Sequence, residues 1–443
     1  MALISKTFSS AGNRKTWTWS AWLKIIGDTS KNYTLMTQVD GWAANGNAGF
    51  YLNGESLQAY NFLSNVNAGT SSRVSTTAYL RDPNAWYHVV LRFDTTQSSA
   101  SDRVRWYING ELQTDLAHAN YPSQNFDANF NTAAAHGIGR HTDSNTYPYE
   151  GAMSHIHFCD GYSYAPTEFG ETDSTTGIWK IKTSPSVSYG TNGFFILKDG
   201  NSVTDQSGNG NNFTVSGGTL TKTEDCPSNV FATINVLGRN AVGYTIENGN
   251  LSTNGTASNA WRGLYGTLGA SSGKFYYECK IATAYNNTGN GFEIGVADVD
   301  GMLNSGKISD AVRGYAYQQG SSLRNNGSST SYGSRINIGD IVGVAVDLDN
   351  SKLYFHRNGT YENSGDPTSG STGTGAISIA SGYTYVPAFS TYYSADDLQL
   401  NFGNGYFGTT AVSSAGTNAS GIGIFEYDVP TGYTAFSTNG LNE

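Results

Sequence analysis

Paired carboxylates are the first residues to consider, because a retaining glycosidase needs two of them. Their carboxyl groups must lie about 5–5.5 Å apart, which alternate acidic residues on one strand can achieve, as in Glu-x-Asp-x-x-Glu. The nearest match is Glu171-x-Asp173, which has Thr176 in place of the second glutamate. Glu278 and Glu293 each stand alone in strand-like segments, where a solvated or hydrogen-bonded carboxylate is the expected role. The sequence therefore predicts no catalytic residue and no enzyme.

Three ligand-type side chains alternate in His155-x-His157-x-Cys159 and would share one face of a strand. Same-face neighbours on a strand lie about 6.5–7 Å apart, which is long for three ligands of one tetrahedral zinc ion. We therefore expect half-buried sheet residues here. The glycine-rich segments lack the Gly-Lys-Ser/Thr of a phosphate-binding loop, and no Gly-x-Ser-x-Gly elbow occurs, so nucleotide binding and a hydrolase triad are also unsupported.

Aromatic side chains beside Gly, Asn and Ser are the strongest binding signal. Rigid rings give contact area at low entropic cost, while amides and hydroxyls supply hydrogen bonds, and the C–H faces of sugars also stack on rings. For each ring, packing in a core or a subunit interface is the open alternative. The candidate ligand-binding residues are Trp42, Tyr60, Tyr147 and Tyr149 in the first half and Trp261, Tyr265, Tyr315, Tyr317 and Tyr332 in the second.

Composition limits the class of protein that could carry these residues. Of 443 residues, 14% are charged and 13% aromatic, and 54 are Gly. Rich aromatic content excludes a disordered chain, while aromatics with Gly-rich turns favour many short strands. The net charge of −10, without a basic block, argues against nucleic acid as a partner. No apolar segment reaches the length of a membrane span, and no secretory signal is evident. We therefore expect that the protein is made in the cytoplasm and does not insert into a membrane.

Strand-like runs recur along the chain and helical periodicity is weak. They predict an all-β fold of two tandem antiparallel β-sandwiches, with a boundary in the polar stretch near residue 200. The expected domains are 1–200 and 236–415, with a linker at 201–235 and a C-terminal extension at 416–443 that could dock or anchor the protein. The expected strands are 16–24, 85–95, 103–111 and 151–160 in the first domain and 273–281, 291–298, 340–347, 352–357, 385–390 and 398–402 in the second.

The first domain resembles the laminin G-like and pentraxin-like branch of the concanavalin A-like jelly rolls. A Trp-x-His-Val strand, an acidic turn and a Tyr-x-Asn-Gly hairpin carry the resemblance, and 151–171 resembles the closing strand of that family. The matching residues are Trp86, His88, Val89, Asp94, Tyr107, Asn109 and Gly110.

Only this resemblance implies a possible calcium site, because laminin G-like domains often hold calcium between loop oxygens. The implied donors are Asp40, Asp94, Asp143 and Asp160. Ordinary acidic turns are the favoured alternative for these four residues. The sequence predicts no cofactor besides this possible calcium.

The second domain resembles a SPRY domain, a bent β-sandwich used mostly to bind proteins or peptides. The order and spacing of its segments both fit. They are 273–278, 291–298, 339–344, the residues Tyr354, Phe355, Asn358 and Gly359, and 387–389.

The arrangement of a jelly roll, a SPRY-like domain and a closing Phe-x-Tyr-x-x-Pro-x-Gly-Tyr stretch is similar to structural proteins of tailed bacteriophages. The resemblance implies a non-enzymatic protein of the virion surface, made in the host cytoplasm and placed in a tail fibre, tail tip or capsid decoration. Its expected partners are other virion structural proteins, copies of itself, and a host-surface glycan or protein. A purely architectural cement protein and a glycan depolymerase are the alternatives, the second disfavoured by the incomplete carboxylate pair.

Overall fold

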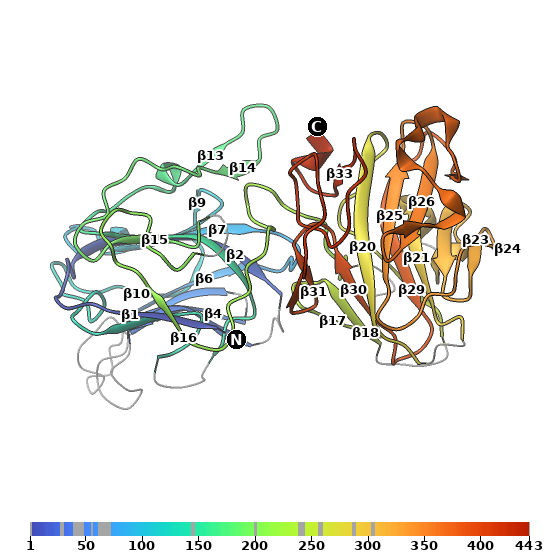
Figure 1. The fold of residues 1–443 in the computed structure, drawn as a ribbon. Helices are drawn as coiled ribbons and strands as arrows, with labels where there is room; N and C mark the ends of the chain where they lie inside the picture. The colour runs from blue at the N-terminus through green and yellow to red at the C-terminus, as the bar shows by residue number, and fades with distance from the viewer. Residues whose placement is uncertain are drawn as a thin grey trace. The chain divides into compact units, whose positions relative to one another are not determined.

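The chain folds into two compact units of β-structure in a computed structural model (Figure 1). The structure describes residues 2–26, 31–38, 48–54, 56–60, 72–142, 147–198, 202–237, 244–255, 260–285, 289–302 and 306–442. The first unit comprises Met1–Lys222 and Cys226–Ser228, and the second comprises Thr223–Asp225 and Asn229–Glu443. Both units are built from antiparallel sheets, which confirms the predicted fold class.

Two sheets face each other in the first unit, with a small hairpin outside them. One sheet has the order β10 (Leu116–Asn120), β6 (Arg73–Tyr79), β5 (Ser56–Tyr60), β4 (Ala48–Asn53), β3 (Asn32–Gln38), β11 (Ala135–Ile138), β1 (Leu3–Thr7), β16 (Thr214–Gly217). The other has the order β15 (Phe194–Ile196), β12 (Gly151–Asp160), β2 (Thr16–Ile25), β7 (Tyr87–Asp94), β8 (Val104–Ile108), β9 (Glu111–Leu112). Strands β13 (Gly170–Thr172) and β14 (Trp179–Ile181) form the hairpin, and η2 (Ala100–Asp102) and η3 (Pro166–Glu168) are single 3₁₀ turns.

Aromatic rings from alternate strand positions fill the space between these sheets. Trp17 and Trp19 on β2 are both completely buried. The Trp17 ring stacks on Phe93 of β7 with ring centroids 4.7 Å apart and also contacts Phe130 and Phe158. Such ring pairs add to the free energy of burial, so the tryptophan-rich strand is the centre of the first core.

The predicted linker at 201–235 is largely part of the two units. Strand β16 pairs with β1 and thereby continues the first sheet, and Phe213 beside it is buried. Phe231 and Ile234 are buried in the second unit. Segment 201–235 is therefore not a linker along its whole length, because its few apolar residues serve the cores.

The second unit also places two sheets face to face. One has the order β17 (Tyr244–Glu247), β18 (Ser252–Gly255), β30 (Asp397–Asn401), β20 (Lys274–Thr283), β25 (Ile341–Asp347), β26 (Lys352–Arg357), β27 (Thr360–Tyr361), with β28 (Ile377–Ser378) paired to β26 and β33 (Thr434–Ala435) paired to β20. The other has the order β19 (Arg262–Tyr265), β29 (Tyr385–Thr391), β21 (Phe292–Asp298), β22 (Gly314–Gln318), β23 (Ser322–Asn325), β24 (Ser328–Ser331). The remaining elements are the hairpin of β31 (Tyr406–Phe407) and β32 (Thr410–Ala411), the short helix α1 (Val299–Met302), and the 3₁₀ turns η4 (Ile308–Asp310), η5 (Glu362–Ser364), η6 (Pro367–Thr372) and η7 (Gly440–Asn442).

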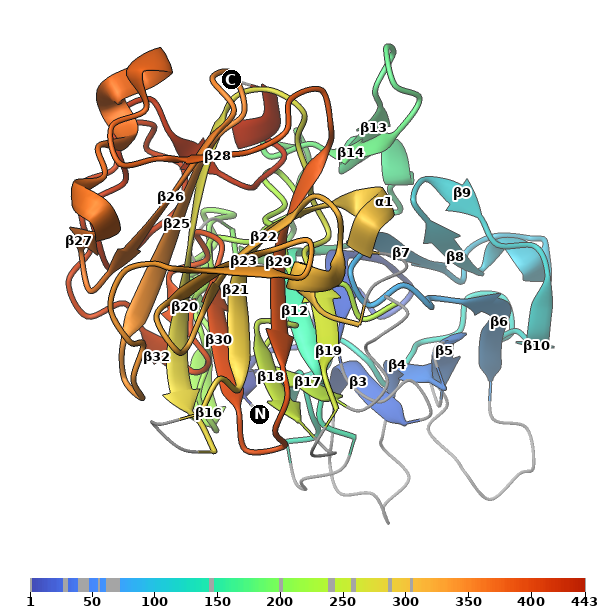
Figure 2. The ribbon, with the colours of Figure 1, turned by 90° about the vertical axis from the view of Figure 1, so that its right-hand side faces the viewer.

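The segment expected as a C-terminal extension belongs to the second sandwich. Strand β20 lies between β25 and β30 (Figure 2). Strand β33 pairs in parallel with Phe275 and Tyr276, near the start of β20. Phe425 and Tyr433 pack in one cluster with Tyr276 of β20 and Tyr354 of β26, on the outer face of this sheet. Segment 416–443 is thus docked within its own chain, where it covers a sheet face that would otherwise meet solvent.

A buried carboxylate connects this covering segment to the sheet. Glu278 of β20 is fully buried and accepts hydrogen bonds from the backbone N–H groups of Glu426 and Tyr427, both at 2.9 Å. The Asn401 amide (3.2 Å) and the Tyr276 hydroxyl (3.0 Å) complete the set. Burial raises the pKa of Glu278 to about 7, although these four donors favour the ionised form.

The donors on Glu278 continue into a chain of polar groups. The backbone N–H of Gly359 donates to Nδ1 of His356, which places the proton of the neutral imidazole on Nε2. Nε2 lies 2.6 Å from the Tyr276 hydroxyl, which in turn donates to Glu278. A Cβ on Gly343 would lie 1.9 Å from the His356 ring, so glycine is required where this ring crosses β25.

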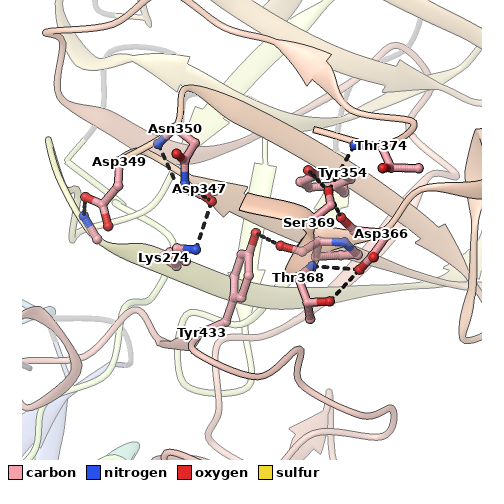
Figure 3. A network of polar contacts seen from close by, with 12 residues as sticks. Lys274, Asp347, Asp349, Asn350, Tyr354, Asp366, Thr368, Ser369, Thr374 and Tyr433 are labelled. Carbon is pink, nitrogen blue, oxygen red and sulfur yellow. Dashed lines mark hydrogen bonds and ion pairs between the residues drawn. The ribbon is translucent and has the colours of Figure 1, made fainter. Parts of the chain in front are cut away.

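A second polar network fixes the loop at 366–375, which is rich in Gly, Ser and Thr (Figure 3). Asp366 accepts from the backbone N–H and the hydroxyl of Thr368 and so caps η6. The Tyr433 hydroxyl donates to the carbonyl of Pro367, and the ammonium group of Lys274 lies 5.8 Å from the centroid of the Tyr433 ring. Lys274 also pairs with the buried Asp347 at 3.1 Å, so the covering segment and the loop hold each other in place.

The first unit covers the outer face of one sheet in a similar way. The His88 ring of β7 lies between the rings of Trp22 and Trp179, at centroid distances of 5.0 and 5.8 Å. Trp179 Nε1 donates to His88 Nδ1, and His88 Nε2 lies 2.9 Å from the Ser20 hydroxyl. Hairpin β13–β14 is thereby attached to the sheet through a neutral imidazole, and burial lowers the pKa of His88 to about 3.

We predict that Glu278→Gln destabilises the second unit by about 1–3 kcal/mol. In either orientation, the new amide NH₂ faces one of the backbone N–H groups that the carboxylate now accepts, so a buried donor loses its partner. The matched control is Glu247→Gln, on the exposed face of β17 in the same unit. Chemical denaturation should show a loss for the first variant and no more than about 0.5 kcal/mol for the second; equal effects would contradict the role of Glu278.

We also predict that acidification destabilises the first unit more than the second. Burial lowers the pKa of His88, of His136 (to about 4) and of His157, so in the folded state these first-unit groups stay neutral while the unfolded chain takes up protons near pH 6.5. Their contribution is present above pH 6.5 and is lost as the pH falls, by about 1.4 kcal/mol per pH unit for each histidine. In the second unit, His356 behaves in the same way. The pKa of Glu278 is raised, however, so protonation of this carboxyl group stabilises the folded second unit as the pH falls from 7 toward 4.5.

Hydrogen exchange of peptides from β2 and β7, compared with β20 and β25, at pH 7 and pH 5 measures the two units separately once the intrinsic exchange rates are corrected. Protection should fall mainly in the first pair. His118→Gln on the partly exposed edge strand β10 is the control and should leave the difference unchanged. An equal loss in both units would refute the assignment to buried histidines.

Candidate functional site

Of the four binding residues predicted in the first unit, the structure describes the side chains of Tyr147 and Tyr149. Trp42 lies outside the described residues, and Tyr60 lies in β5 with its side chain outside them. The half-buried Tyr147 packs against the rings of Tyr51 and His141. Tyr149 is buried, with its hydroxyl bonded to the carbonyl of Lys24 at 3.1 Å, so it is a core residue and not a loop ligand.

Most of the predicted rings in the second unit are structural as well. Tyr317 and Tyr332 are buried and pack on each other and on Phe355 in the core. Tyr265 is buried among small apolar residues, and the Tyr315 hydroxyl accepts the backbone N–H of Ala380. The prediction of loop ligands is corrected for these residues. Alternation along β19 and β22 turns Tyr265, Tyr315 and Tyr317 toward packed neighbours, and Tyr332, which follows β24, packs on Phe355.

Trp261 differs from these rings because it belongs to a cluster outside the described cores. Its ring centroid lies 5.5 Å from that of Tyr392, which lies 4.9 Å from that of Tyr393. Tyr393 stacks on Tyr285 at 4.4 Å, and Tyr285 has 62% of its surface exposed. We call Trp261, Tyr285, Tyr392 and Tyr393 the aromatic cluster, and it is the candidate binding site.

Strand register brings the members of the aromatic cluster together from three segments. Arg262 of β19 pairs with Thr391 of the antiparallel strand β29. Trp261, just before Arg262, and Tyr392, just after Thr391, are therefore neighbours across the two strands. Thr283 of β20 pairs with Asp397 of β30, which brings Tyr285 toward the 392–396 turn. The aromatic cluster therefore lies at one end of the sandwich, where these strands begin or stop.

Asp396 fixes the backbone beneath the rings. This carboxylate is 1% exposed and accepts the backbone N–H groups of Tyr285 at 2.9 Å and Tyr393 at 3.1 Å. Burial raises the pKa of Asp396, and these bonds partly offset the effect by favouring the ionised form. A Cβ on Gly291 would lie 2.9 Å from the Tyr393 ring, so glycine leaves room for that ring.

The charge next to the aromatic cluster is balanced. The Lys307 ammonium lies 4.9 Å from the centroid of the Trp261 ring and 3.6 Å from the Asp310 carboxylate. A cation over a ring is attracted by its π-face, and the neighbouring carboxylate neutralises its charge. The site thus offers ring faces and hydroxyl groups, and the cation over the Trp261 ring is paired with a carboxylate.

Three of the four members of the aromatic cluster were missed by the sequence analysis. Tyr392 and Tyr393 directly follow strand β29, and the sequence Tyr-Tyr-Ser-Ala-Asp-Asp was the available signal. Two adjacent tyrosines at a strand end cannot both face the core, and an Asp in the following turn can collect backbone N–H groups. Tyr285 carried no such signal, because only the pairing of β20 with β30 places it there.

The implied calcium donors are either engaged by the protein or outside the described residues. Asp94 accepts bonds from Thr96 and Gln97, and Asp160 accepts them from Asn13, Asn131 and Asn192. Both carboxylates are buried and organise turns, so they do not fit an open calcium site. Asp40 and Asp143 lie in segments that the structure does not describe. The described part of the chain contains no group of three or more His, Cys, Asp and Glu side chains that could hold a metal.

The acidic residues weighed for catalysis have structural partners. Asp173 accepts from Thr175, Thr176 and Lys180, and backbone N–H groups lower its pKa to about 2. Glu171 is half exposed and also pairs with Lys180, at 3.5 Å. Glu293 is buried and accepts hydrogen bonds from Ser309, so it is a hydrogen-bonded strand carboxylate.

The histidines of the His155-x-His157-x-Cys159 stretch are buried under covering rings. His157 stacks on Phe195 at 4.0 Å and bonds to the Tyr189 hydroxyl, and His155 bonds to Ser154. Burial raises the pKa of the Cys159 thiol, which disfavours the thiolate that a zinc ion needs.

Across the described residues, no helix is long and apolar enough to cross a bilayer.

Comparison with known proteins gives two family matches. Residues 5–165 match the model of the concanavalin A-like lectin/glucanases superfamily, and residues 274–405 match the model of the SPRY domain. Concanavalin A-like lectin and SPRY domains are typically non-catalytic binding folds. None of the curated proteins matches this chain.

Solved SPRY structures are among the similar folds. The SPRY domain of human HERC1 has 17% sequence identity and a TM-score of 0.29, with 35% of this chain and 91% of that chain covered. A second human SPRY domain has 14% identity and a TM-score of 0.27, with 36% and 94% covered. By these two matches and their order, residues 5–165 belong to a laminin G-like, concanavalin A-like domain and residues 274–405 to a SPRY domain that follows it.

Proposed function

We propose that this chain is a non-enzymatic surface protein of a tailed-bacteriophage virion that contacts a glycan or a protein on the host surface. The observation that carries the binding role is the aromatic cluster at one end of the SPRY domain. Exposed rings held in place by a rigid backbone bind at low entropic cost, whereas rings needed for stability are buried. Tyr285, with 62% of its surface exposed, makes no described contribution to a core.

The virion assignment is supported by the resemblance of the domain order to tailed-phage structural proteins. The protein would be made in the host cytoplasm and carried at the virion surface, in a tail fibre, a tail tip or a capsid decoration. Other virion proteins and further copies of this chain are its proposed partners, since such structures are symmetric assemblies. The net charge of −10 argues against binding to nucleic acid.

A non-enzymatic role is supported by the state of the carboxylates. Glu171 and Asp173 share the ammonium group of Lys180, and the low pKa of Asp173 makes it unsuitable as a proton donor. Glu278 and Glu293 are buried under hydrogen bonds from the protein itself. None of these groups offers the pair of opposed carboxyls that glycoside hydrolysis requires.

We predict that the labelled full-length protein adsorbs to cells of a susceptible bacterium and that the double variant Trp261→Ala, Tyr285→Ala adsorbs at least about tenfold less. Loss of the exposed Tyr285 ring and the half-buried Trp261 ring removes contact area worth about 0.5–1.5 kcal/mol per ring pair. Adsorption across a panel of bacterial strains, measured by fluorescence, tests this.

The control is Tyr79→Ala, which removes an exposed tyrosine from the laminin G-like domain and should leave adsorption unchanged. Failure of the unmodified protein to adsorb to any strain, with binding to purified virions retained, would identify an architectural cement protein instead. Shortening of a host polysaccharide by the purified protein would identify a depolymerase and overturn the non-enzymatic role.

A further inference from the structure

We infer that the aromatic cluster binds uncharged pyranose residues, so that glycan recognition by this chain lies on its SPRY domain and not on its lectin-like domain. The inference rests on the proposed function and names the ligand of the same site. It follows from the chemistry of the rings, the balance of charge around them and the way in which their backbone is held.

The rings have the composition that a sugar requires. Three tyrosines and one tryptophan each combine a flat apolar face with a polar group at the rim. A pyranose has the same division, with C–H groups on its faces and hydroxyls around its edge. A peptide-binding groove would in addition present aliphatic pockets for side chains, and the members of the aromatic cluster are all aromatic.

The electrostatics favour an uncharged ligand over an acidic one. Lys307 contacts the face of Trp261 but is paired with Asp310 at 3.6 Å. The Asp396 carboxylate points into backbone N–H groups and is buried, so it repels little outside the protein. An acidic sugar would have to compete with Asp310 for Lys307, whereas a neutral sugar leaves that pair intact.

The site is preorganised, which is what a weak stacking interaction needs in order to give useful affinity. Asp396 bonds to the backbone of Tyr285, which follows β20, and of Tyr393, which follows β29, and Gly291 provides the space for the Tyr393 ring. Ligand binding therefore does not have to order the chain segments that carry the rings.

The laminin G-like domain offers a matched comparison. Tyr162 is 41% exposed and stacks on Tyr164 with ring centroids 5.6 Å apart. Tyr164, however, packs against Phe169 and accepts the backbone N–H of Ser188, so this pair is part of the cover on the outer sheet face. The stacked pair Tyr285–Tyr393 has the further rings of Tyr392 and Trp261 beside it and is the larger platform.

The test uses the full-length protein and soluble polysaccharides as probes: dextran, a linear β-glucan, a mannan and a galactan as neutral chains, and alginate as an acidic one. Affinity electrophoresis should show retardation by at least one neutral chain and none by alginate. Tyr285→Ala should weaken that binding about tenfold, whereas Tyr285→Phe, which keeps the ring, should stay within about threefold. Tyr162→Ala should bind as the unmodified protein does, and circular dichroism verifies that every variant is folded.

Several results would overturn the inference while leaving the proposed function standing. One is adsorption to cells that depends on Tyr285 but is abolished by protease treatment of the cells and is not competed by any neutral polysaccharide; the ligand is then a protein. Another is loss of adsorption in Tyr162→Ala but not in Tyr285→Ala, which would place recognition on the laminin G-like domain. Binding to alginate alone would refute the uncharged ligand. Absence of adsorption to every strain would instead refute the proposed function.

Discussion

A polar group that is taken out of water must find its partners inside the protein, and this requirement shapes both sandwiches. Each has a sheet whose outer face is covered by another part of the same unit, so side chains that would normally face solvent are buried. His88 meets the requirement through Ser20 and Trp179, and Glu278 meets it with four donors, two of them backbone groups of the covering segment. Because sheet and cover supply each other's hydrogen bonds, neither is satisfied without the other.

The same requirement separates structural rings from rings that remain available to a ligand. Tyr317 and Tyr332 are buried in the core of the second unit, where other rings pack on them. The aromatic cluster lies where strands begin and stop, and its rings are half-buried or, in the case of Tyr285, exposed. Asp396 satisfies the backbone groups exposed by the ending strands and, in doing so, holds the rings that follow them. The site is thus a consequence of how a sandwich terminates.

Local sequence patterns predicted what is local in this fold. Strands such as β2 and β12 coincide closely with segments 16–24 and 151–160, because alternation and turn residues act over a few positions. Strand β16 was missed because its partner β1 lies about two hundred residues away, and β33 because its partner is β20. The binding residues were predicted least well: burial of Tyr149 and the grouping of Tyr285 with Trp261 depend on register between distant strands. A count of aromatic residues cannot distinguish these situations.

Strand β33 is the last strand of the second unit in chain order, and this affects how the unit can fold during its synthesis. The laminin G-like sandwich contains strands from β1 to β16 and can close while the rest of the chain is still on the ribosome. The SPRY sandwich cannot, since Phe436 fills its core and β33 borders its long strand β20. Until residue 436 has emerged, Phe275 and Tyr276 of β20 lack their partner strand and the apolar outer face of the sheet lacks its cover, so other nascent copies could associate with this region. Slow translation before this point would therefore favour aggregation, and a chaperone that shields sheet edges would be of most use during that interval.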